Sequence, residues 1–479
     1  MANRKKKVLM MAGAVALAGI VLIILILLFG IKALKPRIEA TASKALGMDV
    51  RIGGGASVSF FPVFGASLAD ITVKNGGADV AAVANMKIGL KLLPLIRRRI
   101  VIGRVEFVKP VISIVRQKNG KLNIETQGGE PSKNPVTVKK LVISQGNVLF
   151  ADLESDKKIE WEGVDITAHD LSAGGTQGGD PLKTLSFTGD ILCRTIRAGN
   201  LTLAGLAMRI AGGNGVFDVS QARMSVFGGT GSGTLHADFT GAEPHFRVTY
   251  SLSRLKIAEL LQGSPNAKNM EGLADFSADL TARGKTAVEV KQSLSGQVSL
   301  NGKNIGLNSI DIDGLLSSLE RSQNFNLVDV GSFFLAGPLG AALTRGYSFA
   351  DLYKESQGGK SVIAELVSIW RVGNGVAEAV DVAMATKKNR IAMKGGLNFI
   401  NNRYEDVIVA VLDQGGCAVF SQKVRGPFNR PEIGKISTLR SLTNPVTNLL
   451  GRAKKLFEHG PCVVFYSGSV APPEHDKLP

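Results

Sequence analysis

Residues 246–253 read Phe246-Arg247-Val248-Thr249-Tyr250-Ser251-Leu252-Ser253, with an apolar side chain at every even position and a polar one at every odd position. The same alternation recurs at residues 235–240 and 274–283. Alternation of period two predicts β-strands that turn one face to an apolar environment and the other to water. Antiparallel sheets carry such strands, whereas the strands of all-parallel sheets are continuously apolar. We therefore expect a mainly β protein with antiparallel strands.

The composition and the turn sequences agree with this class. The 479 residues include 56 glycines, and the apolar share of 44% excludes wholesale disorder. Turn sequences stand at 75–77, 118–121 and 301–302. Short helices are expected at 36–46 and 313–321, the latter capped by Asp311 and Asp313, and a longer amphipathic helix at 437–457.

The sequence leaves open how the apolar strand faces are covered. The expected helices are too few to cover all of them. Two sheets packed face to face would bury them, and from patterning alone this is the commoner solution among domains. The other solution is a single sheet that curls and keeps an apolar concave face for a ligand.

The N-terminal segment predicts a membrane anchor. The stretch from Val8 through Leu22 to Ile31 contains no charged residue, and as a helix at about 1.5 Å per residue it would span roughly 36 Å. A cleaved signal peptide would have a shorter apolar run and a small-x-small site after it. We therefore expect an uncleaved single-pass helix. Basic residues are nearly balanced on its two sides, so charge does not decide its orientation.

Basic residues are the main charge signal, because the net charge is +17. The sharpest cluster is Arg97-Arg98-Arg99, followed by Arg104. Nucleic-acid binding would require aromatic residues beside it for stacking, and none is near. Contact with anionic lipid headgroups is one interpretation of the cluster. A charged strand edge that blocks aggregation is the other.

No motif predicts catalysis, a cofactor site or a metal site. Gly284-Lys285-Thr286 and Gly359-Lys360-Ser361 match the end of a phosphate-binding loop but lack its first glycine, so both are expected to be turns. The five histidines form no metal-ligand spacing. Cys193, Cys417 and Cys462 allow one disulfide, and their positions do not say which.

An ordered set of short sequences resembles the AsmA family of bacterial envelope proteins. After the apolar segment come Ala45-Leu46-Gly47, residues 68–75, Leu92-Leu93-Pro94, Lys109-Pro110 and Asn119-Gly120-Lys121-Leu122-Asn123. A second set, comprising Asn374-Gly375, Gly395-Gly396 and residues 424–427, resembles the closing region of the family. The chain departs from the family at Ile124, where members often have Trp, and in its short middle section.

The resemblance implies an inner-membrane anchor, a body in the periplasm, and an extended, curled antiparallel sheet whose taco-like groove carries phospholipid toward the outer membrane. The groove candidates are then the alternating side chains Phe246, Val248, Tyr250, Leu252, Phe276 and Leu280. Expected regions are a basic tail (1–7), the membrane helix (8–31), an AsmA-like N-terminal β region (36–127), a middle β region (136–300), an AsmA-like C-terminal β region with helical insertions (301–436), and the helix and tail (437–479).

A scaffold that assists outer-membrane protein assembly is the alternative function. Exposed strand edges would pair with strands of client proteins. An enzyme would need a convergent polar site, which the sequence does not indicate.

Overall fold

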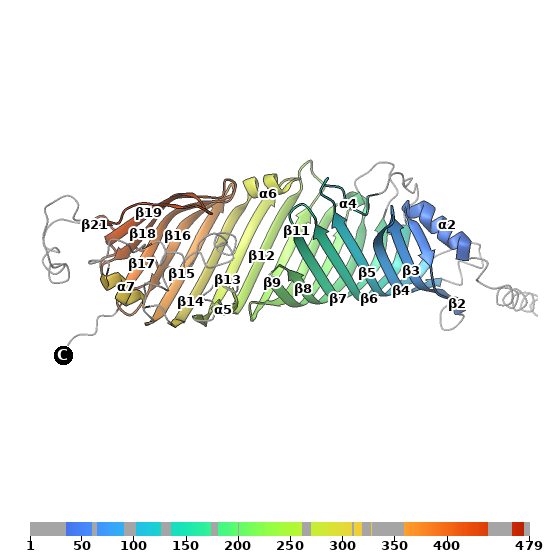
Figure 1. Cartoon of the computed structure of the whole chain (residues 1–479), viewed down its shortest axis with the longest axis horizontal. Coiled ribbons are helices and arrows are strands. Elements are labelled where there is room, and N and C mark those ends of the chain that lie inside the picture. The colour runs from blue at the N-terminus through green and yellow to red at the C-terminus, as the bar shows by residue number, and fades with distance from the viewer. Residues whose placement is uncertain are drawn as a thin grey trace, which may run out of the picture. The chain divides into compact units, whose positions relative to one another are not determined.

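The computed structural model describes residues 35–59, 65–90, 102–125, 136–173, 181–199, 201–260, 270–308, 311–318, 327, 359–438 and 462–473. The predicted anchor at 8–31 and the Arg97-Arg98-Arg99 cluster lie outside these residues, so both stay predictions. No described helix is both long enough and apolar enough to cross a membrane. The chain divides into two compact units, residues 1–201 with 209–214, and residues 202–208 with 215–479. Each unit is mainly β, with few short helices (Figure 1).

Unit 1 is a sheet whose strands mostly follow chain order. Two short strands pair with the same neighbour, β3, one at each of its halves. Its described elements are α2 (Lys35–Leu46), β1 (Asp49–Ile52), β2 (Ala56–Ser59), β3 (Gly65–Asn75), β4 (Ala78–Leu90), β5 (Ile102–Arg116), β6 (Val136–Asp152), β7 (Lys157–Ala173), α4 (Pro181–Thr184) and β8 (Ser186–Ala198). A further strand, β9 (Leu201–Gly213), is divided between the two units.

One pairing in unit 1 departs from the antiparallel expectation. β5 and β6 are parallel, with Phe107 opposite Ile143. Parallel neighbours need a connection that returns the chain to the starting end of the first strand. Residues 117–135 make this connection, and Asn123 ties its described part to β5 through a hydrogen bond from Val115 N (2.8 Å). The expected antiparallel sheet is therefore correct apart from this crossover.

In unit 2, each strand from β10 to β19 pairs with the next along the chain, and every pairing is antiparallel. The short strands β20 and β21 both pair with β19. The elements are β10 (Val216–Val226), β11 (Gly229–Asp238), β12 (His245–Lys256), α5 (Ile257–Leu260), β13 (Met270–Arg283), α6 (Ala287–Ser293), β14 (Ser295–Asn308), α7 (Ile312–Ser318), β15 (Lys360–Gly373), β16 (Val376–Ala385), β17 (Arg390–Asn398), β18 (Arg403–Leu412), β19 (Ala418–Pro427), β20 (Glu432–Ile433) and β21 (Ser437–Thr438).

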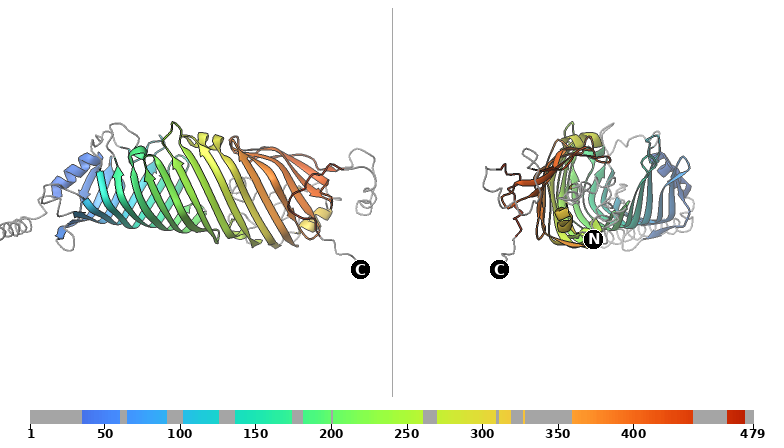
Figure 2. Two further views of the ribbon diagram at one scale, coloured as in Figure 1. Left: turned by 180° about the vertical axis from the view of Figure 1, so that it is seen from behind. Right: turned by 60° about the vertical axis from the view of Figure 1, so that its left-hand side comes forward.

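Bulges interrupt the long strands of both units. Gln145 on β6 and Arg254 on β12 have φ of 54° and 57°, at points where the register shifts. The freed backbone N–H of each donates to a carboxylate on the next strand, Asp165 Oδ1 and Asp275 Oδ1, both at 2.8 Å. A bulge bends its strand and increases the twist. The strands within each unit are accordingly curved (Figure 2).

Helix α2 covers the outer strand β1 of unit 1. Its Ser43 Oγ accepts from Val50 N (2.9 Å) and its Glu39 Oε1 accepts from Ile52 N (2.7 Å). These side chains satisfy N–H groups that an edge strand would otherwise present to solvent. Beneath the helix, Val50 and Ile52 join a buried cluster with residues of β3 and β4.

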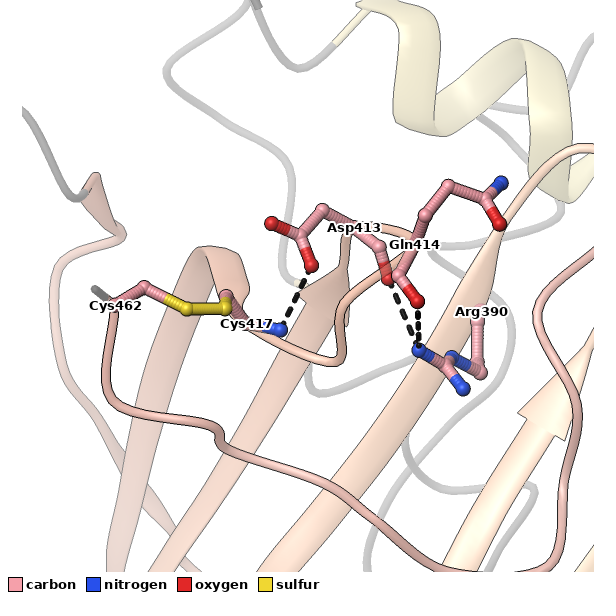
Figure 3. The surroundings of a disulfide bond; sticks show 5 residues. All are labelled: Arg390, Asp413, Gln414, Cys417 and Cys462. Atoms are coloured by element: carbon pink, nitrogen blue, oxygen red, sulfur yellow. Dashed lines mark hydrogen bonds between the residues drawn. A yellow bond between two sulfur atoms is a disulfide. The ribbon is translucent and has the colours of Figure 1, made fainter. Parts of the chain in front are cut away.

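Residues 462–473, here called the C-terminal strap, lie on the sheet of unit 2. A disulfide joins Cys462 to Cys417, so one bridge forms as the cysteine count allows (Figure 3). Phe465 N and Tyr466 N donate to Gly416 O, at 2.9 and 3.0 Å. The Arg390 guanidinium donates to Val470 O (3.2 Å) and to Asp413 O (3.0 Å), linking the strap to two strand ends.

The strap covers an apolar surface. Its Tyr466 and Val470 belong to a buried cluster with Val367 on β15 and with small side chains of β16, β17 and β18. The face of the sheet under the strap is therefore apolar. On β12 and β13, by contrast, one face of the sheet is polar.

Two expected helices are confirmed and one is corrected. The helix expected at 36–46 corresponds to α2, and the one expected at 313–321 corresponds to α7 as far as Ser318, since 319–321 lie outside the described residues. Asp311 Oδ1 caps α7 by accepting from Gly314 N (2.9 Å). The expected helix at 437–457 is wrong at its start, because Ser437 and Thr438 pair with β19 and so satisfy their backbone in a sheet. The remainder of that helix lies outside the described residues.

The sequences that mimic phosphate-binding loops have structural roles. Thr286 caps α6, accepting from Glu289 N at 3.2 Å, while the Glu289 carboxylate accepts from Lys285 N at 2.7 Å. Ser361 lies in β15, and its Oγ accepts from Ile312 N at the start of α7 (2.8 Å). Neither sequence presents a free loop of N–H groups, which a phosphate site of that kind requires.

Candidate functional site

The predicted groove residues lie on one face of β12 and β13. Val248 is paired with Leu280 across the two strands, and Leu252 is paired with Phe276. Phe246 and Tyr250 occupy the same face of β12, opposite alanines of β13. The alternation in the sequence therefore places all six side chains together, as expected.

This face is only partly covered. Val248 is 37% exposed, and Phe246, Tyr250, Phe276 and Leu280 are half-buried. Leu252 is the exception, at 3% exposure. Side chains meshed in a dry core lose nearly all their solvent contact. The β12–β13 part of the face is thus an accessible apolar surface.

The same face becomes sealed further along the sheet of unit 2. Val298 and Leu300 on β14, which pair with Ala278 and Phe276, are 5% and 3% exposed. Trp370 on β15 lies opposite Val298 and is 2% exposed. The strands of unit 2 form one sheet and not two sheets packed face to face. Its apolar face is accessible at β12–β13 and sealed at Val298, Leu300 and Trp370.

Helix α7 packs at the closed part. Its Ile312, Leu315 and Leu316 are buried, and the helix contacts β15. The Asp313 carboxylate accepts hydrogen bonds from Thr386 Oγ1 and from Asn389 Nδ2 (2.7 Å), which fix the helix to the turn between β16 and β17. The helix thus packs at the end of β15 where Ser361 lies.

Unit 1 carries an accessible apolar row that the sequence reasoning missed. Neighbouring pairs on successive strands from β4 to β8 connect Met86, Phe107, Ile143, Ile166 and Ile191. All of these side chains are half-buried. A row of large apolar side chains crosses the strands without being sealed, and we call it the unit 1 apolar row.

The bulges explain why alternation did not reveal this row. A bulge adds one residue and moves all later side chains to the other face. On β6 the apolar positions change phase at Gln145, and on β7 they change at Gly163, where φ is 63°. The signal was nevertheless present as long Val- and Ile-rich strands on both sides of a phase change.

Tyr250 introduces a polar atom into the apolar face of unit 2. Its ring lies over β11, where a Cβ at Gly231 would fall 1.8 Å from the Tyr250 hydroxyl. Glycine at this position is therefore required for the ring to lie there. The hydroxyl is buried and has no hydrogen-bond partner among the described residues, and burial raises the pKa of Tyr250.

The described residues show no convergent catalytic group. No cluster of three or more His, Cys, Asp or Glu side chains among them could hold a metal ion. The pKa of Asp152 is lowered chiefly by the Ser155 hydroxyl, and that of Asp238 chiefly by the Thr240 hydroxyl, both within turns. The thiol of Cys193 is buried, which raises its pKa and disfavours the reactive thiolate. That the protein is not an enzyme stays a prediction.

The sequence of the chain matches the model of a known family. A family model for AsmA proteins matches residues 1–174 and 184–331, which include the unit 1 apolar row and the β12–β13 face. The chain belongs to the AsmA family. The second set of family-like sequences, from 374 onward, lies beyond the matched residues. No curated protein and no solved structure matches the chain at a significant level.

Proposed function

We propose that this AsmA-family protein binds phospholipid on the apolar sheet faces and transfers it between the inner and outer membranes, supporting outer-membrane biogenesis. The observation that carries the proposal is the accessibility of large apolar side chains in both units, at the unit 1 apolar row and at β12–β13. Contiguous exposed apolar surface on a protein marks a binding site.

Acyl chains fit the chemistry of these faces. Removing a methylene from water contributes about 0.8 kcal/mol, so a chain gains affinity from many weak contacts. At the unit 1 apolar row, the described side chains of Phe107, Ile143 and Ile166 provide no polar group that would hold a chain at one position. Such contacts permit movement along the surface, which is what transfer requires.

The location forms part of the proposal. The apolar segment from Val8 to Ile31 anchors the chain in the inner membrane, with the body in the periplasm. The Cys417–Cys462 disulfide supports this placement, because structural disulfides persist in oxidising compartments such as the periplasm.

The scaffold alternative gains no support from β1, one of the two short outer strands of unit 1. Client strands would add to unpaired backbone at a sheet edge. At β1, however, Ser43 and Glu39 of α2 already accept from the N–H groups of Val50 and Ile52. Lipid binding is therefore the function that the described geometry favours.

Photo-crosslinking in living cells separates the two functions. A photoreactive residue at Phe276 or Phe107 is expected to give lipid adducts, because both side chains lie on accessible apolar faces. The matched control is Ser251, which is exposed on the polar face of β12. Protein adducts without lipid adducts at Phe276 and Phe107 would favour the scaffold, and equal lipid labelling at Ser251 would remove the evidence for a specific surface.

A further inference from the structure

Helix α2 is fixed to unit 1 along one side. Its Glu39 and Ser43 accept hydrogen bonds from the backbone N–H groups of Ile52 and Val50, and its Ala42 packs against the buried cluster that contains both. Residues three and four positions apart lie on one face of a helix, so these three side chains of α2 define its inner face. The helix is thus attached firmly to the sheet, and its opposite face points away from it.

The outward face of α2 is basic. Arg37, Thr41 and Lys44 follow one another at spacings of four and three positions, and all three are exposed. Neither Arg37 nor Lys44 forms an ion pair within the described part of the chain. Glu39 is the one acidic residue in the sequence of the helix, and its carboxylate accepts from Ile52 N on the inner side. No carboxylate of α2 therefore offsets the positive charge of the outward face.

Two large apolar side chains of α2 are exposed as well. Ile38, beside Arg37, is 37% exposed, and Leu46 at the end of the helix is 50% exposed. Helices that lie on a membrane surface combine basic residues, which attract anionic headgroups, with apolar side chains that enter the boundary of the acyl region. The exposed surface of α2 offers both kinds of contact.

The proposed anchor keeps α2 close to a membrane. The apolar segment ends at Ile31, and α2 begins at Lys35. An extended chain covers at most about 3.6 Å per residue, so Lys35 lies within roughly 14 Å of the end of that segment. Charges act over about 8 Å at physiological ionic strength, which brings the headgroups within reach of the basic face.

The inner face of α2 adjoins the unit 1 apolar row. Met86 and Phe107, the first two side chains of that row, pack against the same buried cluster as Ala42 of the helix. Leu68 of this cluster is paired with Met86, so the cluster and the row are continuous across β3 and β4. Figure 1 shows α2 beside these first strands of unit 1. A surface that contacts the outward face of α2 therefore lies close to the β4 end of the row.

We propose that the outward face of α2 docks on the anionic surface of the phospholipid bilayer that holds the anchor, with Arg37 and Lys44 at the headgroups. This inference rests on the proposed function for its anchor, and it adds a second contact with the same membrane. An anchor alone leaves the direction of the sheet free. An anchor together with a docked helix that is fixed to β1 orients unit 1 and holds the β4 end of its apolar row next to the membrane.

Photo-crosslinking of the full chain in lipid nanodiscs tests the docking. A photoreactive residue replaces Thr41, and the discs contain phosphatidylcholine alone or with an equal amount of phosphatidylglycerol. Each basic residue near an anionic surface contributes about a fivefold factor in binding. We therefore expect lipid labelling at Thr41 to be at least about fivefold higher with phosphatidylglycerol. Arg37→Gln/Lys44→Gln should lower it to the level seen with phosphatidylcholine alone.

Two controls match this design. Thr188 is exposed on β8, and a photoreactive residue there should label lipid weakly and equally in both kinds of disc. Arg194→Gln/Arg209→Gln removes the same charge from exposed positions on β8 and β9, and should leave the labelling at Thr41 unchanged.

A photoreactive residue at Phe107 in the same discs separates the docking from the proposed function. Lipid labelling at Phe107, without dependence on phosphatidylglycerol at Thr41, would overturn the docking and leave lipid binding on the apolar row intact. Dependent labelling at Thr41 without labelling at Phe107 would support the docking and contradict the proposed function. Lipid labelling at neither position would overturn both. Crosslinks from Thr41 to a second copy of the chain, in place of lipid, would overturn the docking.

Discussion

Asn123, the last residue of the Asn-Gly-Lys-Leu-Asn stretch, acts as a structural residue. Its Oδ1 accepts from Val115 N and its Nδ2 donates to Ser113 O, both at 2.8 Å. Asn75 Nδ2 in turn donates to Asn123 O at 2.8 Å, joining the loop to the end of β3. Near the end of β5, the side-chain amide of Asn123 thus makes the hydrogen bonds that the backbone of a neighbouring strand would otherwise make.

Asn123→Ala should destabilise unit 1. The two short hydrogen bonds and a longer one from Nδ2 to Asp79 O (3.4 Å) are lost. The partly buried N–H of Val115 and C=O of Ser113 are left unsatisfied, so the free energy of unfolding should fall by about 2–3 kcal/mol. Amide hydrogen exchange at Val115 should accelerate in the same variant. Asn119→Ala is the control, because among the described residues the Asn119 side chain accepts from Lys121 N alone, within its own exposed turn. Unchanged exchange at Val115 would contradict the structural role.

Tyr466 makes the strap sensitive to high pH. Burial, followed by the hydrogen bond to Asp381, raises the pKa of Tyr466 to about 12. Because this pKa exceeds the value of about 10 in an unfolded chain, the neutral hydroxyl favours the folded state. Its contribution is complete below pH 10 and is lost as the pH rises toward 12.

Hydrogen exchange of residues 462–473 between pH 9 and pH 12, corrected for intrinsic rates, measures this loss. Across that pH range, protection of these amides should fall more in the wild type than in Tyr466→Phe, because the variant lacks the ionising hydroxyl. The ultraviolet absorbance of the wild type, compared with that of Tyr466→Phe, follows the ionisation of the Tyr466 phenol. Ionisation near pH 10 would show that the environment described for Tyr466 is wrong.

Among the larger elements, the strap depends on its disulfide. The bond joins two cysteines that are 45 positions apart in the sequence. Disulfides typically contribute about 2–4 kcal/mol to the free energy of unfolding. Reduction should lower the thermal midpoint and raise protease sensitivity at 462–473. The Cys417→Ser/Cys462→Ser variant should behave like the reduced protein.

Cys193→Ser serves as the control for reduction, since Cys193 is the free, buried thiol. That variant should still lose stability when the disulfide is reduced. Equal thermal midpoints for oxidised and reduced wild type would indicate that Val470, Tyr466 and Arg390 hold the strap without the bond.

The apolar face of a strand can be predicted from the sequence where no bulge interrupts the alternation of apolar and polar residues. The alternation on β13 runs without interruption from Ala274 to Ala282, so its apolar face was predicted from the sequence alone. On β6 the phase change at Gln145 hid the unit 1 apolar row. No local pattern predicts that Ser437 and Thr438 pair with β19, because that pairing depends on tertiary structure.

The sequence predicted where the candidate site lies, but not how far its accessible apolar face extends across the sheet. Alternation placed Phe246 and Leu280 on one face, and the coordinates agree. The sequence did not show that this face is sealed at Val298 and Trp370, because coverage depends on tertiary packing. The available signal for the closed part was two continuous apolar runs, at 382–385 and 407–412, which are buried on both faces apart from the half-buried Ile408.

At the scale of the whole molecule, both units expose large apolar side chains on a sheet face, and unit 2 also contains a sealed section. A protein whose sheets only stabilised a tethered body would bury these side chains, since each buried methylene contributes about 0.8 kcal/mol. The accessible faces are therefore best explained by a ligand that covers them, and a phospholipid has the required apolar surface.

The central measurement is the lipid that copurifies with the full chain, extracted and quantified by mass spectrometry. The wild type should carry phospholipid, and Ile143→Glu/Ile166→Glu, which places two carboxylates in the unit 1 apolar row, should carry roughly tenfold less, a loss of about 1.4 kcal/mol in binding. Thr137→Glu, at an exposed position on β6, should carry the wild-type amount. A lipid-free wild type, or a folded double variant with undiminished lipid, would contradict the account.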